Sequence, residues 1–168
     1  ANRSNIVNAE ALRRAVRELG EVIGDGSGRY GLVVPDRAVR IGVIAFETLP
    51  DDLWEAESLV RWRMRANLPF DPGEARLTFQ VLSREPGAVE VLAVAIKGSV
   101  LAEYEGLLDQ MNGGPALILP ATVTLLPLLP EEGVGQLLVH VCAGCVTTAV
   151  VAGRRVCAWR DRELGHVA

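Results

Sequence analysis

Three cysteines and a histidine near the C-terminal end are the residues whose chemistry stands out. Cys142 and Cys145 form a C-x-x-C motif, with His140 shortly before it and Cys157 after it. Such a set could provide a redox pair of thiols or part of a zinc site, since protein zinc takes Cys and His ligands. A redox C-x-x-C usually opens a helix, whereas this motif lies between two apolar runs typical of strands. We therefore interpret Cys142 and Cys145 as ordinary buried thiols, which pack like small apolar residues, and expect no bound metal.

A second candidate group lies where a predicted helix ends. Three arginines and a tryptophan occupy its last turns, and the sequence LPF follows them. The cations could bind an acidic partner, but they also complement the negative end of the helix dipole. The aromatic and apolar side chains could anchor a bound segment or belong to the core. The candidate partner-binding residues are Arg61, Trp62, Arg65, Leu68 and Phe70.

The elements that must position these groups can be predicted from hydrophobic periodicity. The run 89–96 is apolar on both faces, so we place it in the middle of a sheet. We expect a mixed sheet of 39–46, 76–82 and 89–96, with helices 52–67 and 99–111 packed on one face. The other predicted helices are 8–23 and 122–129, and the other predicted strands are 31–34, 117–119, 136–141, 145–151 and 156–159. The fold class is therefore α/β.

Several of these pieces also carry a family resemblance. The helix exit with Trp62 and Leu68-Pro69-Phe70 is followed by an acidic turn and by the strand end Phe79-Gln80-Val81-Leu82. The run VEVLAVAIKGSVLAEYEGLLDQM comes next. In this order, from about Asn8 to Gly165, the chain resembles the PilM family, the cytoplasmic actin-like proteins of type IV pilus assembly machines.

The resemblance implies a partial actin-like (ribonuclease H-like) fold with an inserted small α/β subdomain. Residues 39–110 would form the inserted subdomain, and residues 1–38 and 111–168 would belong to the actin-like lobe. The first phosphate-binding hairpin of that fold would precede Ala1, and its second half would follow Ala168. Since the chain also lacks an initial Met, we expect it to be a piece of a longer protein.

The resemblance further implies a degenerate phosphate loop. Actin-like proteins carry a hairpin of the type D-[apolar]-G-[small]-x-x-T. Here His140 stands in place of the Asp and Cys142 in place of the Gly, while Gly144 and Thr147 remain. A neutral imidazole cannot supply a carboxylate's charge to Mg²⁺, and a Cβ crowds the approach of phosphate. We expect no catalytic residues, no nucleotide hydrolysis and no cofactor, with ATP binding left open for the full-length protein.

The composition of the chain argues against several other classes of protein. The chain of 168 residues has a net charge of −4 and no basic block, so nucleic acid is not expected as a partner. The longest apolar stretch, 115–130, is interrupted by prolines, and no run is long enough to cross a bilayer. An odd number of clustered cysteines favours a reducing cytoplasm over a disulfide framework.

The function implied by the resemblance is scaffolding. PilM-like proteins lie at the inner face of the cytoplasmic membrane and bind a cytoplasmic tail of a membrane partner, PilN. A related alternative is the cytoplasmic domain of a type II secretion GspL protein, which docks the secretion ATPase. An active actin-like ATPase and a thiol or zinc protein are the alternatives from other classes. The sequence leaves open whether the chain forms a homodimer.

Overall fold

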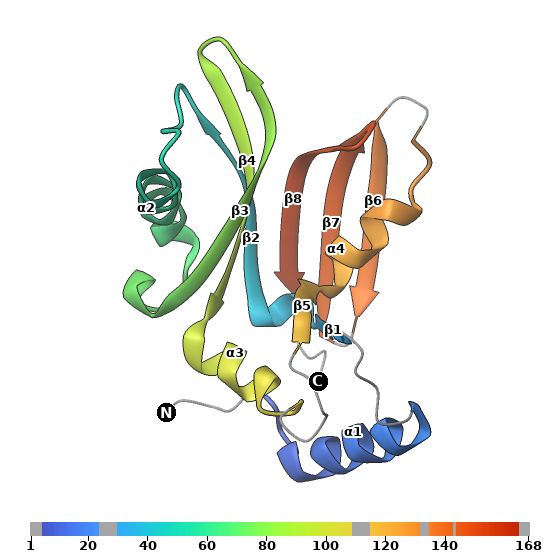
Figure 1. The fold of residues 1–168 in the computed structure, drawn as a ribbon. Helices are drawn as coiled ribbons and strands as arrows, with labels where there is room; N and C mark the ends of the chain where they lie inside the picture. The colour runs from blue at the N-terminus through green and yellow to red at the C-terminus, as the bar shows by residue number, and fades with distance from the viewer. Residues whose placement is uncertain (1–4, 24–29, 109–114, 132–134, 143, 165–168) are drawn as a thin grey trace.

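The computed structural model describes residues 5–23, 30–108, 115–131, 135–142 and 144–164, and these form three sheets (Figure 1). The first is a parallel pair, β1 (Tyr30–Val34) and β5 (Pro115–Pro120). The second contains β2 (Val39–Phe46), β4 (Ala88–Lys97) and β3 (Ala75–Glu85), in that order. The third contains β6 (Gln136–Cys142), β7 (Cys145–Ala152) and β8 (Arg155–Glu163).

Four helices accompany these sheets in the described ranges. They are α1 (Ala9–Ile23), α2 (Leu53–Met64), α3 (Gly98–Glu105) and α4 (Ala121–Leu125). Short 3₁₀ turns follow or precede them: η1 (Asp36–Ala38), η2 (Arg65–Asn67), η3 (Pro72–Glu74) and η4 (Leu126–Leu128). None of these helices has the length and apolar character needed to span a membrane. The element order agrees with the sequence-based prediction, although α3 ends earlier than Met111, which lies outside the described residues.

The interior position predicted for the 89–96 strand is confirmed, but the predicted mixed sheet is wrong. β4 lies between β2 and β3 and pairs antiparallel with both. β3 and β4 are joined by a tight turn in which Gly87 has φ 76°, a conformation that glycine adopts readily. β2 and β3 therefore run in the same direction without touching as neighbours, and every neighbouring pair in this sheet is antiparallel.

The two helices expected on one face of this sheet lie on opposite faces. From α2, Val60 and Met64 pack with the β4 side chains of Val91 and Ala93. From α3, Tyr104 packs with Ile96, whose side chain points to the other face of β4. Since β4 is apolar on both faces, each face needs its own cover.

The rest of that second face is covered by the third sheet. Leu92 of β4 packs with Ala149 and Val151 of β7 and with Val156 of β8. Figure 1 shows the two antiparallel sheets side by side, with β8 next to the β2–β4–β3 sheet. The assignment of residues 39–110 to an inserted subdomain stays a prediction.

Candidate functional site

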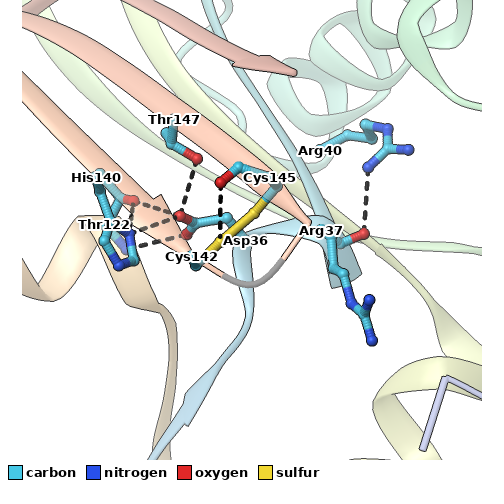
Figure 2. Close-up of a disulfide and its surroundings, with 8 residues drawn as sticks. All are labelled: Asp36, Arg37, Arg40, Thr122, His140, Cys142, Cys145 and Thr147. Carbon is cyan, nitrogen blue, oxygen red and sulfur yellow. Dashed lines mark hydrogen bonds and ion pairs between the residues drawn. A yellow bond between two sulfur atoms is a disulfide. The ribbon is translucent and has the colours of Figure 1, made fainter. Parts of the chain in front are cut away.

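A buried carboxylate lies at the junction of the first and third sheets. Asp36 occupies η1, directly after β1, and is only 3% exposed. Its carboxylate accepts hydrogen bonds from the backbone N–H of Thr122 at 3.0 Å, from the Thr122 hydroxyl, and from Thr147 Oγ1 at 2.9 Å. His140 Nδ1 lies 3.2 Å from Asp36 Oδ2. We call these four residues the Asp36 cluster (Figure 2).

Three segments of the chain supply the partners of Asp36. Thr122 lies in the first turn of α4, directly after Pro120 and Ala121. His140 on β6 and Thr147 on β7 face each other as cross-strand partners. Thr122 Oγ1 also lies 2.7 Å from His140 Nδ1, so the hydroxyl contacts both the ring and the carboxylate. The cluster therefore connects the end of β1, the start of α4 and the β6–β7 hairpin.

The two threonine hydroxyls of the cluster are shielded from solvent. Thr122 and Thr147 are fully buried, and both hydroxyls are bonded to the carboxylate. A nucleophilic hydroxyl must be reachable by substrate and bonded to a base. His140, with its side chain 24% exposed, is the member of the cluster with a partly accessible side chain. Among the described residues, no buried side-chain N or O atom lacks a hydrogen-bond partner.

The four predicted phosphate-loop residues all lie on or beside the β6–β7 hairpin. His140 and Thr147 are cross-strand partners, and both contact Asp36. Gly144 lies in the turn and has φ 81°. The structure thus places a carboxylate beside His140, but it comes from a residue distant in sequence and is already bonded to hydroxyl and amide donors. Loss of phosphate chemistry at this hairpin stays a prediction.

The interpretation of Cys142 and Cys145 as ordinary thiols is wrong, because the structure joins them in a disulfide. The turn makes them direct cross-strand partners with a Cα–Cα distance of 5.4 Å, inside the range of about 4.4–6.8 Å that a disulfide needs. Cys157 is a free, half-buried thiol. Within the described residues, no three His, Cys, Asp or Glu side chains converge as a metal site would require. The expectation of no bound zinc stays a prediction.

Two of the five predicted partner-binding residues have structural roles. The Arg61 guanidinium donates to the carbonyl oxygens of Pro72 at 3.0 Å and Ala75 at 2.8 Å, and pairs with Glu57 at 2.7 Å. It thereby fixes the turn that leads from α2 to β3. Leu68 packs against the core between α2 and the sheet.

Of the other three predicted partner-binding residues, Trp62 and Arg65 are exposed. Trp62 is 53% exposed, and the Arg65 guanidinium lies over its ring, 4.6 Å from the centroid. Phe70 is half-buried in the chain that follows. A role in partner binding stays a prediction for these residues.

Among the hollows that border the sheets in the described part of the chain, two have similar volumes. The first, of about 640 Å³, lies between β2 and β8 and is lined mainly by polar atoms. Of the stretch Arg61–Phe70, which contains the candidate partner-binding residues, only Asn67 lines this hollow. The second, of about 670 Å³, is apolar and lies among α1, β1 and the end of α3. Burial there raises the pKa of Tyr104, whose hydroxyl bonds with the Asn5 side chain.

Sequence reasoning missed Asp36 and Thr122 as members of a site. Asp36 follows a proline after a strand, and Thr122 comes shortly after another proline, before a short helix. Both are ordinary residues for turns and helix starts, so composition gave no reason to single them out. Their roles depend on contacts between segments far apart in sequence.

Comparison with known proteins defines the fold. No protein-family model matches the chain, and no curated protein matches it. A solved structure of a PilM-PilN type IV pilus biogenesis complex matches 96% of this chain and 50% of that chain, with 23% identity and a TM-score of 0.77.

Two further solved structures are similar at lower scores. The cytoplasmic domain of EpsL, an inner-membrane component of the type II secretion system of Vibrio cholerae, matches 87% of this chain and 56% of that one (13% identity, TM-score 0.51). A Bacteroides thetaiotaomicron protein of unknown function with an actin-like ATPase fold matches 89% of this chain and 55% of that one (12% identity, TM-score 0.50). The chain thus spans about half the length of the structures it matches. It has a partial actin-like α/β fold of the kind seen in the PilM-PilN complex.

Proposed function

We propose that this chain is part of a scaffold at the inner face of the cytoplasmic membrane, where it holds a cytoplasmic tail of a PilN-like membrane partner in a type IV pilus assembly platform. The observation that carries the proposal is the likeness along 96% of the chain, at a TM-score of 0.77, to a PilM-PilN complex. The buried hydroxyls of the Asp36 cluster support a binding role over a catalytic one, because they are not accessible to a substrate.

The contact surface that we assign to the partner consists of the exposed Trp62 and Arg65 together with the half-buried Phe70. Aromatic and arginine side chains are enriched among the residues that dominate binding energy at protein interfaces. The cation over the Trp62 ring holds a large apolar surface in place before binding, which reduces the entropy lost on association. Arg61 holds the turn that follows α2, and Leu68 packs against the core beneath the helix.

The test is binding of a synthetic peptide that carries the cytoplasmic terminus of a PilN-like protein. Trp62→Ala, Arg65→Ala and Phe70→Ala should each weaken binding by about 1 to 2 kcal/mol in titration calorimetry. Trp54→Ala is the matched control, because Trp54 lies on the same helix and is 76% exposed. Unchanged binding in all three variants, or an equal loss in the control, would place the contact elsewhere.

The GspL-like alternative is supported by the weaker likeness to the EpsL cytoplasmic domain. It predicts binding to a secretion ATPase in place of a pilus membrane protein, so the same chain should be titrated against both partners.

We also propose that the chain hydrolyses no ATP. A phosphate-release assay with Mg²⁺ should show no turnover above buffer, and turnover that disappears in Thr147→Ala would contradict this proposal.

A further inference from the structure

The two faces of the third sheet differ in how they are covered. On β6, Leu138 points to the inner face and packs against the core of this sheet. The alternate residues Leu137, Val139 and Val141 point to the other side, which we call the outer face. Their side chains are 65%, 51% and 67% exposed, and none of the three packs against a buried apolar cluster of the described residues. The inner face of β6 is therefore part of the core, whereas its outer face is apolar and exposed.

β7 continues this apolar surface. Residues that lie directly opposite each other on antiparallel strands point to the same side of the sheet. Val150 lies opposite Leu137, and Val146 lies opposite Val141. Val150 is exposed, and Val146 is half-buried. The aliphatic side chains of β6 and β7 thus form one continuous surface, and a continuous exposed apolar surface marks a place of contact with another element or molecule.

The third strand adds positive charge to the outer face. Arg160 and Arg162 of β8 lie opposite outer-face residues of β7 and are exposed. The carboxylates of the same stretch, Asp161 and Glu163, alternate with the arginines and belong to the inner side. Where the structure describes the chain, no carboxylate forms an ion pair with either arginine. The outer face is therefore aliphatic on β6 and β7 and cationic along β8.

We propose that the outer face takes an amphipathic helix from the further part of a longer chain, with an apolar stripe on β6 and β7 and an acidic flank over β8. Sheets of α/β folds are commonly covered by helices on both faces. The PilM-PilN structure matches 96% of this chain over only 50% of that chain, so as much of the matched protein again lies outside the shared part. The proposal depends on this likeness of fold and not on the pilus function.

The dimensions of the outer face suit one helix that lies along the strands. From Leu137 to Val141, β6 rises by about 14 Å, which is the length of roughly nine helical residues. A helix with its side chains is about 10 Å wide, and β6 and β8 lie about 10 Å apart, at two strand spacings. A helix centred over β6 and β7 would therefore bring one flank above Arg160 and Arg162. Carboxylates on that flank would neutralise two like charges that neighbour each other on one side of a strand.

Other occupants fit the outer face less well. A second copy packed face to face would set its arginines either against aliphatic side chains or against Arg160 and Arg162 of the first copy. A surface that meets a bilayer is typically rich in Trp and Tyr. No aromatic residue occupies the outer face among the described residues, and Trp159 of β8 packs against the core instead.

Synthetic helical peptides of about eighteen residues, or five turns, provide the probe. Three stapled versions share one stripe of Leu residues and carry Glu, Gln or Lys on the flank. In fluorescence anisotropy with the whole chain, the Glu version should bind about tenfold more tightly than the Lys version, because its charge complements the arginines. Equal affinities of the two, or no binding of the Glu version, would overturn the proposal.

Variants of the outer face locate the contact. Val139→Thr/Val141→Thr keeps the β-branched shape that suits a strand and should weaken binding of the Glu peptide at least tenfold, because it makes the apolar surface polar. Arg160→Gln/Arg162→Gln should remove the advantage of the Glu peptide over the Lys peptide. Affinity that survives both double changes would contradict the proposed contact.

Each double change has a matched control outside the third sheet. Val33→Thr/Val81→Thr alters two other exposed strand valines, on β1 and β3. Arg76→Gln/Arg84→Gln removes two exposed arginines of β3. Both controls should leave peptide binding unchanged, and a loss equal to that of the outer-face variants would place the contact elsewhere.

The reactivity of a cysteine on the outer face tests where the helix comes from. Val139→Cys, in a Cys157→Ser background, should react with a maleimide in this chain and at least tenfold more slowly in the full-length protein. Ser58→Cys, at an exposed position of α2, is the control and should react equally in both. Equal reactivity of Val139→Cys in both would overturn the proposal. A dimer in sedimentation, or binding to vesicles of anionic lipid, would also overturn it if Val139→Thr/Val141→Thr abolishes that association.

Discussion

Replacing Thr147 by Val tests whether the Asp36 cluster stabilises the fold. Thr147 is fully buried, and its hydroxyl donates to Asp36 Oδ2 at 2.9 Å. Val has nearly the same shape, so the change removes one hydrogen bond and opens no large cavity. A hydrogen bond to a charged group contributes about 1.5–3 kcal/mol to stability, and Thr122 still donates to the carboxylate after the change. We therefore expect the free energy of unfolding to fall by about 1.5–3 kcal/mol.

Thermal unfolding followed by circular dichroism measures this loss. For a domain of this size, the expected decrease corresponds to a shift in Tm of about 3 to 12 °C. Thr148→Val is the matched control, because Thr148 is the next residue on β7 and its hydroxyl donates to the backbone oxygen of Arg160 at 3.3 Å. Its uncharged and longer contact should contribute less, about 0.5–1.5 kcal/mol. Equal losses in the two variants would refute the central role given to the Asp36 carboxylate.

Three other predictions follow from the same structure. Alkylation should label one thiol before reduction and three after it, and labelling of all three without reduction would contradict the disulfide. The double change Cys142→Ser/Cys145→Ser should lower the free energy of unfolding by only about 2 kcal/mol, because the disulfide closes a very short loop. Because burial raises the pKa of Tyr104, its phenol ionises first in the unfolded chain, so stability is retained below pH ~10 and lost as pH rises further. Tyr104→Phe should flatten that decline in urea titrations run across alkaline pH. Met64→Ala, at a fully buried site, should lower stability by about 2–5 kcal/mol, whereas Leu53→Ala at a 72% exposed site on the same helix should change it by less than about 0.5 kcal/mol.

The helices and strands could be predicted because their periodicity is strong and local. The run from Val89 to Ile96 is apolar at nearly every position, and such a run is buried on both faces. Periodicity also assigns residues of β4 to one face or the other. It does not say which element covers each face, and for this reason α2 and α3 were wrongly expected on the same side.

The candidate site could not be predicted from local sequence patterns, because its residues come from distant parts of the chain. The hairpin residues His140 and Thr147 were singled out through a family resemblance, but their main partner is Asp36, which lies in an ordinary turn sequence. The disulfide was missed for a related reason. Whether Cys142 and Cys145 face each other depends on the register of the hairpin, and a shift of one residue would have separated them.

The Asp36 cluster also has a consequence for the order in which the chain folds. Its bonds join residues 86, 104 and 111 positions apart. The β3–β4 and β7–β8 hairpins each form from neighbouring segments, whereas the cluster requires the closure of loops of about a hundred residues, which carries a larger entropy loss. The hairpins can therefore form before the carboxylate meets its partners. Contacts made late are absent from the folding transition state, so we expect changes at the cluster to speed unfolding and to leave the folding rate nearly unaltered. On this reasoning we expect Asp36 to affect chiefly the lifetime of the assembled fold and not the rate at which it forms.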